Sequence, residues 1–158
     1  MYGCSLIYGF SGSTNFDQIS NNISEVQYGL TLGIVFILVG LAFKISAVPF
    51  HMWAPDVYQG SPTSVTIFFA ILPKIAALSV FIRFLYVPFI NLIDQWQTII
   101  IFVSIASMVF GAVAAIGQKN LKRLMAYSSI SHMGFALAGL AVGTNEGIQS
   151  SLIYISIY

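Results

Sequence analysis

The stretch GLAFKISAVPFHMWAPDVYQGSP, residues 40–62, places a lysine and a proline inside an apolar run. The proline, Pro49, interrupts any helix that the run forms, because it lacks a backbone donor and its ring clashes with the preceding turn. The lysine, Lys44, is a charged group in an otherwise apolar segment, and such a group is costly and usually functional. We therefore predict a broken helix here and take Lys44 as the first functional candidate.

The composition of the whole chain is that of an integral membrane protein. Of its 158 residues, 58% are hydrophobic and 7% are charged, and the mean hydropathy is +0.88, whereas a soluble domain has about a quarter of its residues charged. The net charge of +1 provides no basic field for nucleic acid. The single cysteine, Cys4, excludes an internal disulfide and a cysteine-ligated cluster, and no glycine-rich nucleotide motif is present. We therefore predict no metal and no cofactor in this chain.

The apolar segments predict an all-α fold, a polytopic transmembrane helix bundle that forms one domain over residues 1–158. A span needs about 20 apolar residues, so the segments at the two ends count as partial spans. We therefore expect a piece of a longer membrane protein or one product of a split gene. Ser107, Gly111 and Ala115 recur every four residues and predict a close helix–helix approach. The predicted spans are 1–10 (partial), 29–58 (broken), 63–84, 98–117, 124–143 and 148–158 (partial).

The broken span is predicted to have two helical halves. The first runs from about Gly29 to Ile45, the break covers residues 46–49, and the second half passes through HMWAPDVY. Non-helical backbone at membrane depth is tolerated only where protein or a water-filled cavity satisfies its polar groups. Aromatic residues near the predicted membrane interfaces are interpreted as an aromatic belt: Trp53, Tyr58 and Trp96.

One short loop, QKNLKR, sets the predicted topology. It holds half of the six lysine and arginine residues of the chain, and the positive-inside rule places it in the cytoplasm or the mitochondrial matrix. We interpret its three basic residues as topology determinants: Lys119, Lys122 and Arg123. Alternation of the spans then places the acidic loops on the opposite side, namely residues 11–27, residues 144–147 and the loop of Asp94.

A second lysine, Lys74, also lies inside an apolar run. Lys74 lies ~16 Å along the helix from Thr63, near the bilayer midplane. Burial disfavours a charged ammonium group, whereas a nearby carboxylate or water favours it, so a buried lysine can load and release a proton. Asp56 lies near a helix end and the other four acidic residues fall in loops, so the counter-charge is Asp56 or lies outside the chain. The alternative is that Lys44 and Lys74 only snorkel or cap carbonyl groups at the break.

Two histidines are further candidates for a proton relay. His51 follows Pro49 at the predicted start of the second half-helix and could pass protons from Lys44 to water; the alternative is a hydrogen-bonded packing histidine. His132 shares a helix face with Ser128; together with Ser128, Ser129 and Ser131 it could form a polar patch that supports a water chain. The alternative there is that the hydroxyls bond to the preceding turn or to a neighbouring helix.

Three phrases resemble a known family: LAFKISAVPFHMWAPDVYQGSP, PKIAALSVFIRF and GQKNLKRLMAYSSISHMGF. They resemble chain N, also called subunit 2, of respiratory NADH:quinone oxidoreductase (complex I). The resemblance extends over the whole chain and less than half of the family's length. It implies an antiporter-like subunit of the proton-pumping membrane arm, built from two inverted repeats, each with a discontinuous helix.

The resemblance also implies partners, cofactors and location. It places the chain in a lipid bilayer, in the mitochondrial inner membrane or the bacterial plasma membrane, beside other membrane-arm subunits. It places NADH, FMN, the iron–sulfur clusters and the quinone in other subunits. Residue by residue, Lys44 matches the family's lysine on the broken helix and Lys74 its central lysine. The family's glutamate partner falls before Met1 and its distal lysine after Tyr158.

The mechanism implied is proton translocation driven by quinone reduction elsewhere in the complex. We hypothesise that Lys44 exchanges its proton with Lys74 through water. Two other functions stay open: a subunit of a multisubunit cation/proton antiporter, which sodium dependence would distinguish, and a truncated structural subunit without transport. The wording PFHMWAPDVYQGSP favours chain N.

Overall fold

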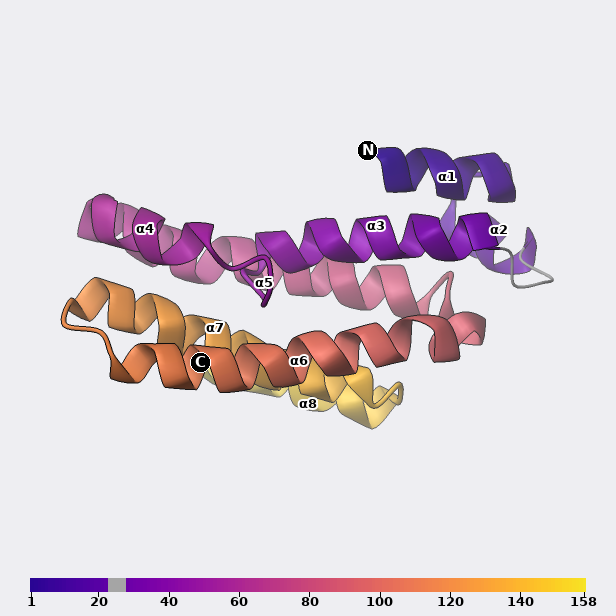
Figure 1. Cartoon of the computed structure of the whole chain (residues 1–158). Coiled ribbons are helices and arrows are strands. Elements are labelled where there is room, and N and C mark those ends of the chain that lie inside the picture. The colour runs from indigo at the N-terminus through magenta and orange to yellow at the C-terminus, as the bar shows by residue number, and fades with distance from the viewer. Residues whose placement is uncertain (23–27) are drawn as a thin grey trace.

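The computed structural model describes residues 1–22 and 28–158, and every regular element in these residues is a helix (Figure 1). The all-α prediction is confirmed. The elements are α1 (Tyr2–Ser11), α2 (Phe16–Asn22), α3 (Tyr28–Lys44), α4 (Trp53–Gly60), α5 (Thr63–Tyr86), the short 3-10 helix η1 (Ile90–Leu92), α6 (Ile93–Ile116), α7 (Leu121–Ala141) and α8 (Asn145–Ile157).

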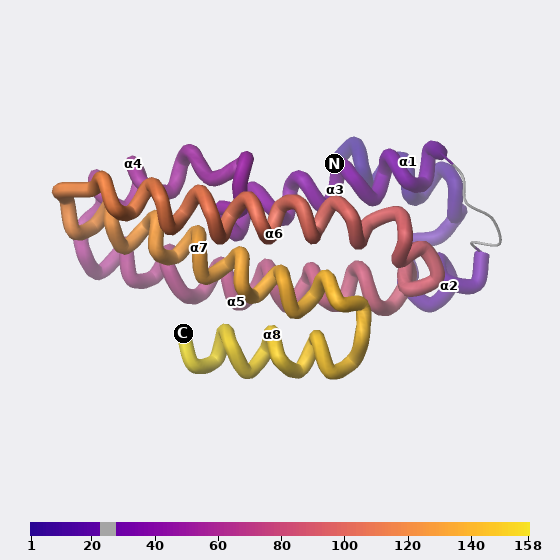
Figure 2. Tube along the Cα trace, turned by 60° about the horizontal axis from the view of Figure 1, so that its bottom comes forward, coloured from indigo at the N-terminus to yellow at the C-terminus, as the bar shows by residue number. Residues whose placement is uncertain are grey.

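The long helices run side by side along one common direction. α3 and α4 follow each other in one line, with a break between them, and α5 lies alongside (Figure 1). α6 packs along α7, α4 also packs on α7, and α1 lies on α3. α8 lies along α7, and Figure 2 shows that it stops short of the end at which α7 begins. α7 therefore lies at the centre of the contacts that position the site.

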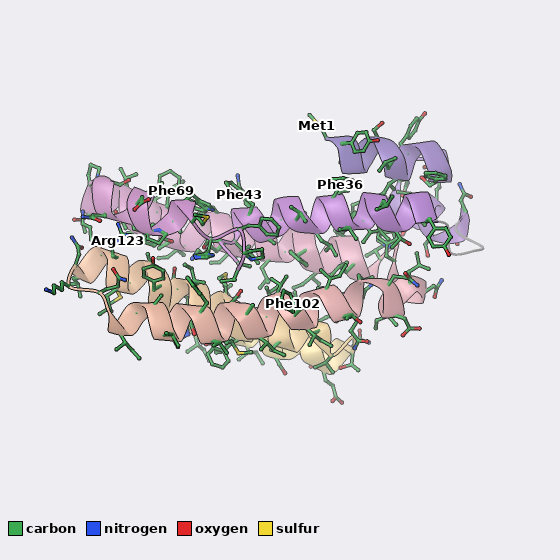
Figure 3. All side chains as sticks on the ribbon, viewed as in Figure 1. Met1, Phe36, Phe43, Phe69, Phe102 and Arg123 are labelled. Atoms are coloured by element: carbon green, nitrogen blue, oxygen red, sulfur yellow. The ribbon has the colours of Figure 1, made fainter. Side chains whose placement is uncertain are left out.

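The helices have the length and surface that a bilayer requires. In the described residues, three helical segments are long enough and apolar enough to cross a membrane: Thr63–Tyr86, Ile90–Ile116 and Leu121–Ala141. α3 is apolar but shorter, with 17 residues, or ~26 Å of helix. Large apolar side chains point outward, among them Phe36 and Phe102 (Figure 3), and Phe102 is 68% exposed. Such a surface suits lipid rather than water.

Part of the segment predicted as a polar loop, residues 11–27, is helical. α2 forms there because its two apolar residues find partners at the end of the bundle: Ile19 is buried, and the Phe16 ring lies 6.4 Å from that of Phe84. Asn15 caps this helix, since its side-chain oxygen accepts a hydrogen bond of 3.0 Å from the Asp17 amide. Residues 23–27 of the predicted loop, which include Glu25, lie outside the described residues.

Three other helices begin earlier than predicted, at Ile93, Leu121 and Asn145. Side-chain caps explain two of these starts. The Asn120 side chain accepts the Lys122 amide at 2.9 Å, and the Thr144 hydroxyl accepts the Gly147 amide at 3.2 Å. Parts of the predicted loops are therefore first helical turns. The hydropathy pattern missed these turns because they are polar.

The bundle has two chemically different ends. Asp17, Asp94 and Glu146 lie in the first turns of α2, α6 and α8, at the right-hand end in Figure 1; we call this the acidic end. α7 begins at the other end, where Lys119 precedes it and where Figure 3 shows Arg123; we call this the basic end. The predicted separation of these acidic residues from the basic segment is confirmed.

Small residues bring α6 and α7 together. A Cβ atom added at Gly111 would lie 2.7 Å from the backbone nitrogen of Ser131, and one added at Gly134 would lie 2.9 Å from the Ser104 carbonyl oxygen. Both distances are too short for a real side chain, so glycine is required at these two positions. The predicted close approach at Gly111 of α6 is confirmed, and Gly134 of α7 makes a second close approach between the same two helices.

Candidate functional site

The break between α3 and α4 is longer than predicted. Helical backbone ends at Lys44 and resumes at Trp53, whereas the predicted break covered residues 46–49. Ser46 adopts a left-handed conformation with φ of 57°, which ends α3 one residue early. Residues 50–52 form turns, in which the Phe50 amide donates to the Ala47 carbonyl at 2.7 Å. His51 therefore lies within the break and not at the start of the second half-helix.

Protein groups satisfy the backbone of the break, as expected at membrane depth. The Val48 amide donates to the Ser107 hydroxyl of α6 at 2.9 Å. The indole nitrogen of Trp53 donates to the Phe43 carbonyl at 2.9 Å and so joins the two half-helices directly. The Ala47 amide donates to the Ala42 carbonyl at 2.9 Å. The break is thus a defined structure anchored to α6.

Lys44 is exposed in the described chain, whereas its place inside an apolar run predicts a buried lysine. It is the last residue of α3, and its side chain lines a groove of about 290 Å³ between α3 and α5. Pro73 and Val80 line the α5 wall of this groove. A basic residue at a helix C-terminus is favourably placed beside the free carbonyl groups.

Lys74 is the buried lysine of the structure, with 2% of its surface exposed. Its Nζ atom donates a hydrogen bond of 2.8 Å to the hydroxyl of Ser129 on α7. The same Nζ lies 5.7 Å from the centre of the Tyr58 ring, which belongs to α4. Three helices therefore meet at this one ammonium group, and two of its three donors remain available.

Asp56 is already paired and is therefore not the counter-charge of either lysine. Its carboxylate lies 2.7 Å from the Arg123 guanidinium, and this is the one ion pair within 4.0 Å in the described part of the chain. Arg123 also donates to the Gln59 side chain at 2.9 Å, and the Lys122 ammonium donates to the Ser61 carbonyl at 2.7 Å. Two of the three basic residues interpreted as topology determinants, Lys122 and Arg123, therefore also hold α4 against α7.

Two residues beside Lys74 were missed or misread from the sequence. Ser129 was placed with His132, yet its hydroxyl accepts the Lys74 hydrogen bond and donates to the Ala126 carbonyl at 2.8 Å. Tyr58 was interpreted as part of an aromatic belt, but it is 1% exposed. Trp96, read in the same way, is also buried. The contact between Lys74 and Ser129 spans 55 positions, and no local sequence signal reports it.

The two histidines make different contacts from those predicted. The His51 ring lies 4.5 Å from that of Phe110. Its buried Nδ1 atom makes no hydrogen bond of full geometry in the described residues, although the side chain interacts with the Pro49 backbone. His132 makes a hydrogen bond of 2.6 Å through Nδ1 with the Tyr154 hydroxyl of α8. Ser129 and Ser131 turn toward other helices, so the predicted patch around His132 is divided.

Two open cavities flank Lys74. One, of about 320 Å³, lies among α4, α5 and α7, and Tyr58, Lys122 and Ser129 are among its lining residues. The other, of about 290 Å³, lies between α5 and α8 and is lined by Lys74 itself. In residues 1–22 and 28–158, no three His, Cys, Asp or Glu side chains are close enough to share a metal ion. The chemistry available here is therefore that of an amine and hydroxyl groups.

A discontinuous helix beside a membrane helix with a buried lysine is typical of membrane transport subunits. The chain belongs to the transmembrane family of NADH:quinone oxidoreductase and Mrp antiporter subunits, which matches it over residues 1–158. It is therefore an integral membrane protein.

Individual relatives agree with the resemblance to chain N. NADH-quinone oxidoreductase subunit N of Pelagibacter ubique is 77% identical over the whole chain, which covers 34% of that protein. The chain spans about a third of the length of the curated relatives that it matches. A subunit of respiratory complex I from Thermus thermophilus is 36% identical with a TM-score of 0.78, over 98% of this chain and 33% of that one.

The fold is shared with antiporters. A subunit of the Mrp complex from Dietzia is 27% identical with a TM-score of 0.88, over 97% of this chain and 28% of that one. The named relatives of high identity are bacterial, which favours the bacterial plasma membrane over the mitochondrial inner membrane.

Proposed function

We propose that this chain is part of a proton-translocating subunit of NADH:quinone oxidoreductase and that Lys74 carries the transported proton. The observation that supports this most directly is the environment of Lys74: it is buried, and it bonds to a hydroxyl rather than to a carboxylate. A carboxylate would hold the ammonium form in an ion pair. A serine hydroxyl can accept from an ammonium group and can donate to an amine, so it permits both protonation states.

The wider assignment rests on the relatives named NADH-quinone oxidoreductase subunit N. In this proposal, the energy comes from quinone reduction, and NADH, FMN, the iron–sulfur clusters and the quinone are held by other subunits. The partners are other membrane-arm subunits and lipid. The outward-facing apolar residues of α5 and α6, such as Phe68 and Phe102, suit either neighbour.

Lys44 has a secondary place in the proposal, as a group that exchanges its proton with Lys74 through water. Its groove is lined by Pro73, the residue before Lys74, but the Lys74 side chain turns to α7. Water between the two lysines must therefore pass around α5. His51 and His132 are kept as relay candidates. His51 is favoured because its Nδ1 atom makes no hydrogen bond of full geometry in the described residues, where its polar interaction is with the Pro49 backbone, whereas His132 is bonded to Tyr154.

The test replaces Lys74 by methionine in the complete complex. Lys74→Met keeps an unbranched side chain of similar length but has no exchangeable proton. We expect coupled proton translocation to fall by about a hundredfold, because a positioned proton-transfer group contributes about 10²–10⁴-fold. Lys119→Met, at an exposed lysine of the basic end, is the matched control. A normal number of protons pumped per NADH in Lys74→Met would overturn the proposal.

The fold match to the Mrp complex favours a second candidate, cation/proton exchange. Replacing sodium by potassium in the transport assay separates the two candidates. Exchange would depend on sodium, whereas proton pumping would not. The identity of 77% to a subunit N, against 27% to the Mrp chain, favours proton pumping.

A further inference from the structure

The hydroxyl group of Tyr58 is buried without a full set of partners. Tyr58 is 1% exposed. Its hydroxyl makes no hydrogen bond of full geometry in the described part of the chain, although it interacts with Ser129. Buried hydroxyl groups are almost always hydrogen-bonded to protein or to ordered water. The Tyr58 hydroxyl therefore points to a missing hydrogen-bonding neighbour.

The cavity beside Tyr58 has room for that neighbour. Its volume of about 320 Å³ exceeds the ~10–15 Å³ that a cavity needs to hold one water. A buried water needs two to four polar partners, and Tyr58 and Ser129 both line this cavity. Thr66 and Lys122 line it as well, and Lys122 lies in the first turn of α7, so the cavity extends toward the basic end.

The same cavity leads to Lys74. The second cavity, which Lys74 lines, shares Ala70 and Tyr158 with the first. Ser129 lines the first cavity and is hydrogen-bonded to Lys74. The Ser129 hydroxyl therefore connects the first cavity to Lys74.

We propose that water fills the cavity among α4, α5 and α7 and that the Tyr58 hydroxyl passes protons from this water to Lys74 through Ser129. This inference rests on the proposed function. Ser129 gives its hydroxyl proton to the unprotonated Lys74 amine and receives the proton of Tyr58. Tyr58 receives one from water, which is reprotonated from the aqueous phase at the basic end. Both hydroxyl groups end the transfer neutral, and Lys74 ends it as ammonium.

A purely structural role for Tyr58 predicts a different result on substitution. Its ring lies over the Lys74 ammonium, and Tyr58→Phe keeps that ring but removes the hydroxyl. The matched control is Tyr86→Phe on the same bundle, which removes a hydroxyl that donates to the Leu140 carbonyl at 2.8 Å. Tyr86 lines neither of the two cavities beside Lys74.

We expect Tyr58→Phe to slow coupled proton translocation about tenfold or more in the assembled complex, whereas Tyr86→Phe leaves the rate unchanged. Lys74→Met is measured in the same membranes. If Lys74→Met is inactive and Tyr58→Phe has the normal rate, the Tyr58 route is wrong and the proposed function stands. If Lys74→Met pumps normally, the proposed function itself is wrong.

Water access can be measured without any activity. In a Cys4→Ser background, Thr66→Cys introduces a thiol into the wall of the cavity, and Ser79→Cys introduces one on the exposed face of the same helix. A charged, membrane-impermeant thiosulfonate is added to inverted vesicles of the complete complex. We expect Thr66→Cys to react and Ser79→Cys, in lipid, not to react. Failure of Thr66→Cys to react from either side of the membrane would overturn the water-filled route.

Discussion

Lys74 is held by neutral groups, and this governs what single substitutions should do. Its surroundings are a serine hydroxyl, a tyrosine ring and apolar side chains such as Met133 and Ile155. The ammonium form has few partners, and Ser129 is the one hydrogen-bond acceptor identified for it in the described residues. The protonation state of Lys74 should therefore be sensitive to small changes at Ser129.

Ser129→Ala tests this dependence. The variant removes the acceptor of the Lys74 hydrogen bond. The other bond that it removes joins Ser129 to the Ala126 carbonyl within α7 itself, so we expect α7 to keep its helical backbone. Hydrogen bonds to charged groups contribute about 1.5–3 kcal/mol, so we expect coupled proton translocation to fall about tenfold while assembly of the complex is normal. Ser150→Ala, at an exposed serine of α8 whose hydroxyl bonds within its own helix, is the control. A normal rate in Ser129→Ala would argue against a role for this hydroxyl.

For single residues, the sequence predicts where a charged side chain lies along a span but not which side chains it contacts. Lys74 could be placed at mid-membrane because a lysine within a long apolar run is conspicuous. Ser129 and Tyr58 could not be assigned to it, because their approach depends on how α4 and α7 pack against α5. The same compositional reason predicts a buried Lys44, yet in the described chain this side chain is exposed in the groove between α3 and α5.

α4 depends on its neighbours for its position. It has eight residues, and isolated helices of that length are unstable in water. Contacts at the basic end hold it on α7, through the pair of Asp56 with Arg123 and through the bond of Lys122 to Ser61. Since α4 carries Tyr58, these contacts should also determine how the Tyr58 ring lies over Lys74.

A charge exchange tests the anchoring of α4. Arg123→Glu places a like charge beside Asp56, and we expect coupled turnover to fall about twofold to fivefold, since exposed ion pairs are individually weak. The double variant Asp56→Lys with Arg123→Glu restores an opposite pair and should recover the turnover. Lys119→Glu is the control for loss of positive charge at this end. No recovery in the double variant would mean that the pair does not position α4.

At the element scale, the broken helix was predictable from Pro49, but its extent was not. The break extends further because Ser46 leaves the helical region at one end and because residues 50–52 form turns at the other. The early starts of α7 and α8 depend on caps by Asn120 and Thr144. A hydropathy pattern reports apolar spans and passes over such polar first turns.

The whole molecule has an asymmetry of charge along the bundle axis. The acidic end carries Asp17, Asp94 and Glu146, with Arg83 in the last turn of α5. The basic end carries half of the six basic residues of the chain, and its one carboxylate in the described residues, Asp56, is paired with Arg123. This asymmetry could be predicted from the sequence because it needs only loop composition and alternation of spans.

The asymmetry predicts the orientation of the complete subunit in the membrane. Because short segments rich in lysine and arginine stay on the cytoplasmic side, a cysteine at Lys119 should react with an impermeant maleimide in inverted vesicles, and one at Asp94 in right-side-out cells. Both variants are made in a Cys4→Ser background, which itself should not react. Reaction of both cysteines from the same side would contradict the arrangement of α6, whose helix connects these two positions across the bundle. The reverse assignment would keep the fold but would place the Tyr58 cavity on the far side, so that protons would have to enter Lys74 from the opposite compartment.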